Sequence, residues 1–357
     1  MATQASRLLD LLAIRVPIVQ APMAGVSSPA MAAAVSESGG LGSLGVGAMN
    51  ADKAREAIRQ FRVLSSGSLN VNVFVHRPAH ADASKEAAWL QHLRPDFERY
   101  GAKAPDALRE IYTSFLEDAD MLAMFVDEKP KVVSFHFGLP HPGQVEALHR
   151  AGVVLLATAT NVEEAKAIQR AGIDGVIAQG YEAGGHRGVF DPDAEDNRLG
   201  TFALTRVLTR AVDLPVIAAG GIMDGAGIAA ALKLGASAAQ LGTAFVATDE
   251  SLADKGYREH LFSDAAHHTT MTRAISGRPA RSLANAFTRL GASISADLIP
   301  DYPIAYDAGK SLNAAAKAAG EAGYGAQWAG QGAPLARAMS SRALMQVLQD
   351  ELEHASH

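Results

Sequence analysis

Residues 153–180 read VVLLATATNVEEAKAIQRAGIDGVIAQG, and this stretch indicates the architecture of the whole chain. An apolar run over 153–158 predicts a buried strand, a helical pattern follows over 162–171, and a second apolar run covers 175–179. Gly172 stands just beyond the expected helix, where glycine accommodates the left-handed turn that ends many helices. Two short strands separated by a helix are typical of a parallel β-α-β unit.

The same pattern extends in both directions along the chain. The expected strands cover 17–22, 41–44, 69–75, 131–137, 153–158, 175–179, 215–219 and 238–245. The expected helices between them cover 28–38, 52–64, 143–151, 162–171, 201–212 and 225–234. Eight such strands favour an α/β fold of the (β/α)₈ TIM-barrel type, and an open, doubly wound sheet is the alternative.

Two segments interrupt this repeat. Residues 77–130 predict a helical insertion, and residues 250–357 predict a helix-rich C-terminal segment. We therefore expect the barrel to comprise residues 1–76 and 131–249. We expect both additional segments to cover its active-site mouth and to shape the substrate pocket.

Composition limits the classes of function. The 357 residues include 48% hydrophobic residues, as in ordinary globular proteins, and carry a net charge of −6, which gives no general attraction for nucleic acid or anionic lipid. No apolar stretch is long enough for a membrane span, and the N-terminal residues do not resemble a secretory signal. The absence of cysteine excludes disulfides and thiolate metal ligands. We expect a cytoplasmic protein, as a monomer or homodimer, without a nucleic-acid or membrane partner.

Glycine-rich strand ends predict a phosphate site. Ala219-Gly-Gly-Ile222 follows the seventh expected strand, and Gln240-Leu-Gly-Thr243 ends the eighth. TIM barrels commonly bind phosphate after these two strands, because backbone amides there are free to donate. Either motif alone would be interpreted as a tight turn, whereas the pair favours phosphate.

Histidines offer further chemistry. His186 lies in Gly184-Gly-His-Arg-Gly188 at the end of the sixth strand, where an imidazole can act as a base or donate to an anion. His136 is a lesser candidate for the same pocket. His76 and His80 are separated by Pro78, which disfavours a helical metal site, so we expect no metal. The pattern at 40–45, GLGSLG, overlaps an expected strand and therefore does not indicate a nicotinamide site.

Several blocks taken together resemble the flavin-dependent nitronate monooxygenases, and the class I form in particular. They are QAPMAG (20–25), NVNVF (70–74), SFHFGLP (134–140), QGYEAGGHRG (179–188), AAGGI (218–222) and QLGTAF (240–245). The resemblance implies a (β/α)₈ barrel that binds FMN, with His186 as the active-site histidine. It implies FMN contacts from Met23, Asn72, Gln179, Gly184, Gly221, Gln240, Leu241, Gly242 and Thr243. It implies a substrate pocket with His136, Tyr257, Tyr302, Tyr306 and Lys310.

The resemblance also implies a reaction. Propionate 3-nitronate or another alkyl nitronate would be oxidised with O₂ to a carbonyl product (malonic semialdehyde from propionate 3-nitronate) and nitrite or nitrate. Single-electron transfer would give a flavin semiquinone, and the resemblance implies a role in detoxification. Two alternatives remain: an FMN-dependent NAD(P)H:quinone or enoyl-thioester reductase on a related barrel, and a flavin-free barrel that binds a sugar phosphate or serves as a scaffold.

Overall fold

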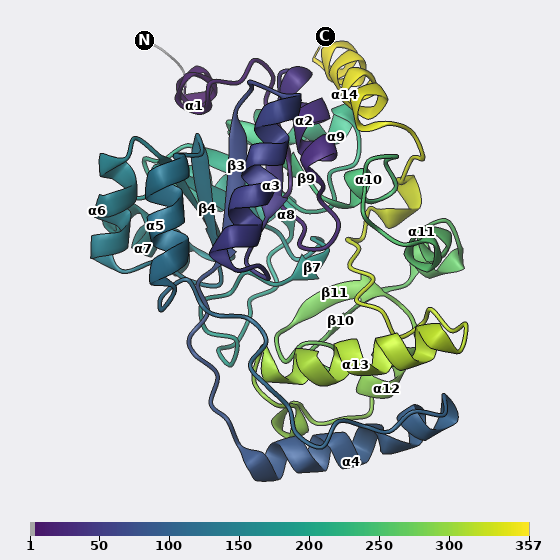
Figure 1. Cartoon of the computed structure of the whole chain (residues 1–357). Helices are drawn as coiled ribbons and strands as arrows, with labels where there is room; N and C mark the ends of the chain where they lie inside the picture. The colour runs from purple at the N-terminus through teal and green to yellow at the C-terminus, as the bar shows by residue number, and fades with distance from the viewer. Residues whose placement is uncertain (1–3, 357) are drawn as a thin grey trace.

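A barrel of parallel strands lies at the centre of the computed structural model, which describes residues 4–356 (Figure 1). Its strands are β1 (Ile18–Gln20), β2 (Gly42–Gly45), β3 (Leu69–Phe74), β4 (Val132–His136), β5 (Val154–Ala159), β6 (Gly175–Gln179), β8 (Val216–Ala219) and β9 (Ala238–Leu241). All of them match expected strands. The pattern at 40–45 contributes to strand β2 and forms no strand-to-helix turn.

Closure of the sheet distinguishes the two predicted architectures. The strands pair in the order β1-β9-β8-β6-β5-β4-β3-β2, every pair being parallel. A bridge between Val19 and Leu41 joins the two ends of this order, with backbone hydrogen bonds of 3.0 Å from Gln20 N to Leu41 O and from Leu41 N to Ile18 O. The predicted TIM barrel is therefore confirmed, and the open sheet is excluded.

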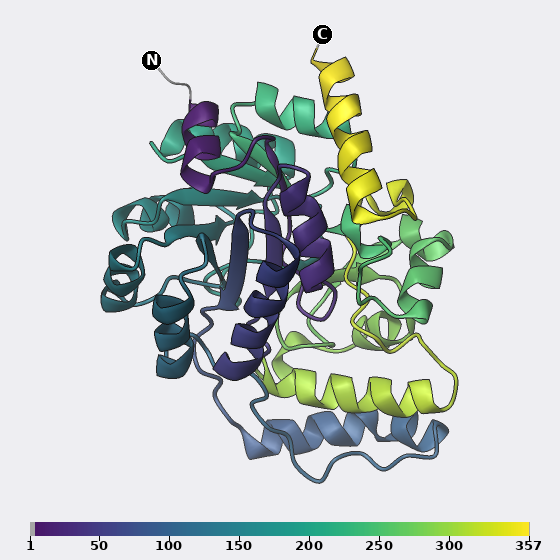
Figure 2. The same ribbon diagram turned by 45° about the horizontal axis from the view of Figure 1, so that its top comes forward.

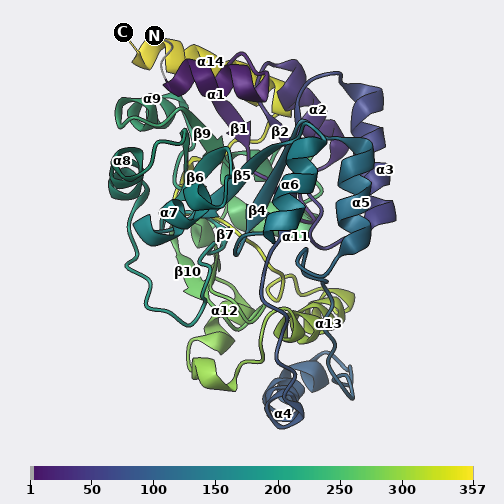
Figure 3. The same ribbon diagram turned by 90° about the vertical axis from the view of Figure 1, so that its left-hand side faces the viewer.

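Helices surround the barrel, as Figures 2 and 3 show. They are α2 (Pro29–Glu37), α3 (Ala51–Leu64), α5 (Ala119–Glu128), α6 (Pro142–Arg150), α7 (Val162–Arg170), α8 (Thr201–Ala211), α9 (Gly225–Lys233) and α14 (Ser341–Ala355). Local signals set their limits: the Asn161 side chain accepts a hydrogen bond from Glu164 N at the start of α7, and Gly172 adopts a φ of +76° after its end.

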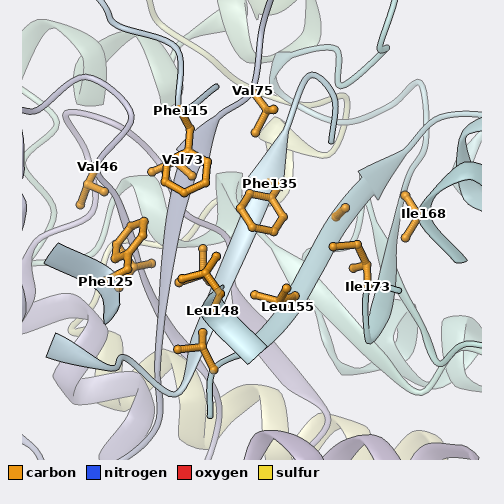
Figure 4. Close-up of a cluster of buried hydrophobic side chains, with 14 of the residues drawn as sticks. Val46, Val73, Val75, Phe115, Phe125, Phe135, Leu148, Leu155, Ile168 and Ile173 are labelled. Atoms are coloured by element: carbon orange, nitrogen blue, oxygen red, sulfur yellow. The ribbon is translucent and has the colours of Figure 1, made fainter. Parts of the chain in front are cut away.

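Both faces of the strands are buried. In β5, Leu155 and Ala157 point towards the helices, whereas Val154 and Leu156 point into the barrel. Figure 4 shows the outer layer, where Phe135 and Leu155 lie near Leu148 of α6 and Ile168 of α7. Burial of each such side chain contributes about 1.5–3 kcal/mol. Inside the barrel, side chains of α1 (Gln4–Leu12) close the end near the strand starts.

A second layer covers the carboxyl ends of the strands (Figure 1). It contains a three-stranded sheet in the order β10-β11-β7, formed by β7 (Gly185–His186), β10 (Thr269–Thr272) and β11 (Ala280–Leu283). It also contains α11 (Lys255–Leu261), α12 (Ala286–Gly291), α13 (Ile304–Ala318) and α4 (Ala83–Arg99), with the short α10 (Thr243–Val246) beneath it. Helix α4 lies along α13, and Trp89 and Phe97 share an apolar cluster with Leu312.

Parts of the two additional segments lie elsewhere than expected. Helix α5, from the insertion, packs beside α3 and α6 on the barrel, where Met124 and Phe125 join the main core. Helix α14, from the C-terminal segment, packs between α2 and α9, with Leu344 and Leu348 buried there. Helix α4, the irregular stretch of the insertion around Tyr112 and the region before α14 contribute to the cover. The reason is that an apolar helix face specifies burial but not the surface that buries it.

Candidate active site

A cavity of ≈ 390 Å³ lies between the barrel mouth and the covering layer, within the range of cofactor and small-molecule sites. Fourteen of the fifteen residues predicted for the site line it: Met23, Asn72, His136, Gln179, Gly184, His186, Gly221, Gln240, Gly242, Thr243, Tyr257, Tyr302, Tyr306 and Lys310. Leu241 is the exception, because its side chain points outwards into the cluster under α2, α9 and α14. Strands that are spread over about 220 residues of sequence thus contribute side chains to the same cavity.

The ends of β8 and β9 form one side of the cavity. Gly220 and Gly221 have φ values of +120° and +70°, which L side chains rarely adopt. At Gly242 a Cβ would lie 3.4 Å from Ala21 Cβ and 3.8 Å from Met23 Sδ. Gln240 Oε1 is buried here without a hydrogen-bond partner among the described residues. This side of the cavity therefore offers close backbone approach and a free polar atom to a ligand.

The amide of Gln179 is used within the protein. Its Nε2 donates to His186 O at 2.9 Å, and its Oε1 accepts from Gly188 N at 2.7 Å. The side chain of Asn72 donates to Ser134 O and Ser134 Oγ, both at 3.0 Å. Gln179 thus fixes the 186–188 backbone over the cavity, and Asn72 is held against β4.

His186 lies in a small sheet rather than in a flexible loop. It belongs to β7, which pairs with β11 so that His186 faces Ala280, and its Nε2 lies 2.8 Å from Ser276 Oγ. The imidazole packs against Phe137, Tyr302 and Trp328, at ring-centroid distances of 5.5, 5.4 and 5.1 Å. Burial, reinforced by the charges of His136, Arg278 and His76, holds the pKa of His186 well below its usual range. The ring is therefore uncharged at neutral pH.

His136 is bound at both ring nitrogens. Its Nδ1 lies 3.0 Å from Thr158 Oγ1, and its Nε2 lies 3.1 Å from His186 O. Burial lowers the pKa of His136 to about 4. This histidine lines the cavity while supporting the backbone of His186.

Tyrosines and one lysine form the opposite wall. Lys310 Nζ lies 4.9 Å from the ring centroid of Tyr112 and 5.4 Å from that of Tyr306. Burial raises the pKa of Tyr306 to about 12 and raises that of Tyr302 well above its usual value, so both hydroxyls keep their protons. Tyr302 OH is buried without a partner among the described residues, whereas Tyr257 OH donates to Trp328 O. The wall thus presents hydroxyl donors and one cation.

A second, smaller cavity of ≈ 190 Å³ adjoins the first. Tyr257, Tyr306, Lys310 and Trp328 line both cavities. These side chains therefore form the partition between the two cavities.

Sequence reasoning missed several residues of the site. Tyr112, Trp328 and Gly330 line the cavity, and Ser276 contacts His186 from behind. Tyr112 lies in an irregular part of the insertion, and Trp328 lies in a turn-rich segment, so neither follows a strand pattern. One sequence feature could have indicated this part of the site, because Gly330 and Gly332 form a second glycine pair. In the structure, Gly330 N donates to Thr243 Oγ1 at 2.9 Å.

The fold and the cavity define the class of protein: a TIM-barrel enzyme with its site at the carboxyl ends of the strands. The model of the nitronate monooxygenase family matches residues 5–351. The chain belongs to the nitronate monooxygenase family, an oxidoreductase family.

Individual relatives agree with this assignment. The chain is 63% identical to a nitronate monooxygenase of Paraburkholderia phytofirmans over 348 residues, covering 98% of this chain and 95% of the relative. It is 51% identical to a nitronate monooxygenase of Pseudomonas aeruginosa over 346 residues, covering 97% and 99%.

Solved structures resemble the fold over almost its entire length. A nitroalkane oxidase from Streptomyces ansochromogenes superposes with a TM-score of 0.88 at 42% identity, covering 98% of each chain. FabK from Thermotoga maritima superposes with a TM-score of 0.73 at 30% identity, covering 99% of this chain and 97% of that one. None of the helices over residues 4–356 combines the length and apolar character needed to cross a membrane.

Proposed function

We propose that this enzyme is an FMN-dependent nitronate monooxygenase that oxidises propionate 3-nitronate and other alkyl nitronates with O₂. The products are a carbonyl compound, malonic semialdehyde for propionate 3-nitronate, and nitrite or nitrate. The observation that carries the proposal is the single cavity in which the glycine ends of β8 and β9 lie together with His186 and the Tyr302–Tyr306–Lys310 wall. Family membership and the named relatives support the nitronate substrate class.

The residues of the cavity fit FMN. Gln240 Oε1 is a buried acceptor without a partner among the described residues, as an amide N–H of a flavin ring would require. The backbone at Gly221, Gly242 and Thr243 would hold the phosphate, since no Cβ blocks approach at the two glycines. We propose that Met23, Asn72, Gln179, Gly184 and Leu241 complete the contacts, Leu241 through its backbone alone. Bound FMN would supply the one-electron oxidation of the nitronate and the reaction with O₂.

The substrate side of the cavity suits an anion that needs no deprotonation. A nitronate has already lost its α-proton, so the protein must bind and orient it. Lys310 and the tyrosine hydroxyls would neutralise and hydrogen-bond the anion, while Phe74, Tyr112 and Trp328 would exclude water. The uncharged imidazole of His186 would orient the substrate and, for a neutral nitroalkane, would be the group able to accept a proton.

The test combines a spectrum with a product assay. We expect purified protein to show the absorbance of bound flavin and to release nitrite from propionate 3-nitronate in air. Protein without flavin, or flavoprotein that releases no nitrite, would contradict the proposal. A Gly221→Val variant serves as the cofactor-free control.

A reductase is the second candidate, and the FabK structures, at lower identity, are the observation that favours it. Anaerobic NADH or NADPH distinguishes the two functions. Rapid bleaching of the flavin would support an NAD(P)H:quinone or enoyl-thioester reductase, whereas a nitronate monooxygenase should remain oxidised. We further propose that the enzyme acts in the cytoplasm, as a monomer or homodimer.

A further inference from the structure

A buried positive charge lies directly behind the cavity wall. Arg278 is 4% exposed, its Nη2 donates to Val189 O, and its Nε has no hydrogen-bond partner within the described chain. Among residues 4–356 no carboxylate oxygen lies within 4.0 Å of it, whereas the equally buried Arg187 is paired with Asp196 at 2.7 Å. Asp193 and Asp191 act on this charge only through space, and a buried charge without a directly paired carboxylate is costly.

Phe137 links this charge to the cavity. The guanidinium carbon of Arg278 lies 4.3 Å from the centroid of the Phe137 ring. The same ring also packs against His186 and Tyr302, at centroid distances of 5.5 and 5.3 Å. Phe137 has a φ of +79°, a conformation that is strained for an aromatic residue and that occurs mainly where function requires it. One aromatic ring therefore separates the guanidinium from the cavity wall.

The segment that carries Arg278 also fixes His186. Ser276 Oγ contacts His186 Nε2 at 2.8 Å, and Pro279 O accepts from Arg187 N at 2.8 Å. Strand β11, which begins at Ala280, pairs with β7. Segment 276–281 thus positions both the imidazole of His186 and the buried guanidinium of Arg278.

We propose that Arg278 supplies the fixed positive charge that holds the substrate anion beside His186, acting across the ring of Phe137. The inference rests on the proposed nitronate function, because it requires an anion in the cavity. Arg278 does not line the cavity, so it is a positioning residue rather than a catalytic one. The charge of Arg278 would explain how the cavity attracts an anion although the imidazole of His186 is uncharged.

Other titratable groups around His186 do not replace this charge. They are His136 at the end of β4, His76 after β3, Tyr302 just before α13, Tyr306 in α13, and Lys310 one turn further along α13. Burial lowers the pKa of His76 and of His136 to about 4, and both tyrosines are neutral. Lys310 is the other cation at the site, with its Nζ 5.4 Å from the ring centroid of Tyr306. Arg278 keeps its charge at neutral pH, since burial lowers its pKa only to about 10.

Charge-changing variants of the holoenzyme test the proposal. Arg278→Gln should weaken anaerobic binding of propionate 3-nitronate, and raise its KM, by roughly tenfold, as expected for one charge at this separation. The kcat should change much less, and binding of neutral nitroethane should be nearly unaffected. Arg278→Lys should restore most of the affinity. Arg273→Gln is the matched control, because Arg273 lies in the same loop but is paired with Asp193 at the surface.

A second readout requires no turnover. The titration of the His186 ring, followed by NMR and assigned by its loss in His186→Asn, should move to higher pH in Arg278→Gln, because the charge of Arg278 helps to lower this pKa. If no variant oxidises nitronate, the proposed function fails, while this titration still tests the charge. Unchanged nitronate affinity in Arg278→Gln, or equal losses in the Gln and Lys variants, would overturn the inference. If Arg278→Gln does not fold, Arg278→Met takes its place under the same criteria.

Discussion

The buried, aromatic surroundings of His186 determine the protonation state of its imidazole. The sequence places this residue beside glycines and permits either a charged or an uncharged imidazole, whereas the folded chain buries it among aromatic rings and beside Ser276. Burial lowers its pKa well below the usual value, so the neutral form prevails across the physiological pH range. Under the proposed function, His186 would therefore orient substrate and accept a proton, and it would not supply positive charge.

Replacing His186 measures that contribution. Under the proposed function, the ring would contact substrate rather than the FMN phosphate. His186→Asn should therefore lower kcat/KM for propionate 3-nitronate by about 10- to 1000-fold while FMN remains bound. Steady-state nitrite release and the flavin spectrum are the measurements. His149→Asn, at a half-exposed site paired with Asp174, is the control. Equal kinetic constants in the two variants would mean that His186 has a packing role alone and no role in turnover.

Gly221 should be required for the cofactor. Gly221→Val would force a β-branched residue to a φ of +70° and place its Cβ 3.3 Å from Glu182 Cβ, at the wall assigned to the FMN phosphate. We expect flavin-free protein on purification. Gly172→Val provides the control, since Gly172 has a φ of +76° but no atom within 4 Å of the added Cβ. Normal flavin content in Gly221→Val would contradict the assignment.

At the scale of elements, one carboxylate joins two helices of the ring. Glu128, at the end of α5, accepts from Arg55 at 2.8 Å and from Arg59 and Arg62 of α3, and its side chain is 6% exposed. Burial opposes its ionisation, but the arginine hydrogen bonds and charges outweigh this effect and lower the pKa of Glu128. These three ion pairs attach α5 to the barrel instead of to the cover.

Glu128→Gln should destabilise the fold by about 1–3 kcal/mol at neutral pH, because the charged hydrogen bonds are lost. Since the folded pKa lies below the usual 4.5, the stabilisation is complete above that pH and is lost as pH falls through the folded pKa. Urea unfolding at pH 7 and at about pH 3.5 should show a difference that shrinks on acidification. Glu146→Gln, at an exposed pair, should have no measurable effect. A pH-independent difference would refute the interpretation.

The sequence predicts which helices and strands form, but it does not predict where every helix packs. Every expected strand and its following helix is present because alternation, cap residues and glycines after helix ends act within a few residues. The positions of α5 and α14 were not predictable in this way. The apolar faces of these two helices could pack on either the barrel or the cover. Each helix packs on the barrel because the ring of helices around it leaves room there.

The whole molecule consists of two layers around the cavity, and a cofactor between them should stabilise both. Adding FMN to apoprotein should raise the unfolding temperature in a concentration-dependent manner, corresponding to about 2.7 kcal/mol at a free concentration 100 times the Kd. Calorimetry of the apo and FMN-loaded forms is the measurement, with riboflavin, which lacks the phosphate, as the comparison ligand. Identical transitions with and without FMN would contradict a site between the layers.

The sequence by itself determined the order of strands and helices and favoured the barrel, because both follow from short-range periodicity and from glycines at strand and helix ends. Together with the family resemblance, it also identified fourteen residues that line the cavity. Only the tertiary structure decided that Tyr112 and Trp328 line the cavity and that Ser276 contacts His186. It alone also decided that α14 completes the ring of helices and that Arg278 lies against the ring of Phe137 without a directly paired carboxylate. The physical reason is that local pattern specifies which side chains are buried. Their neighbours, and hence their protonation and charge, depend on contacts between segments far apart in the chain.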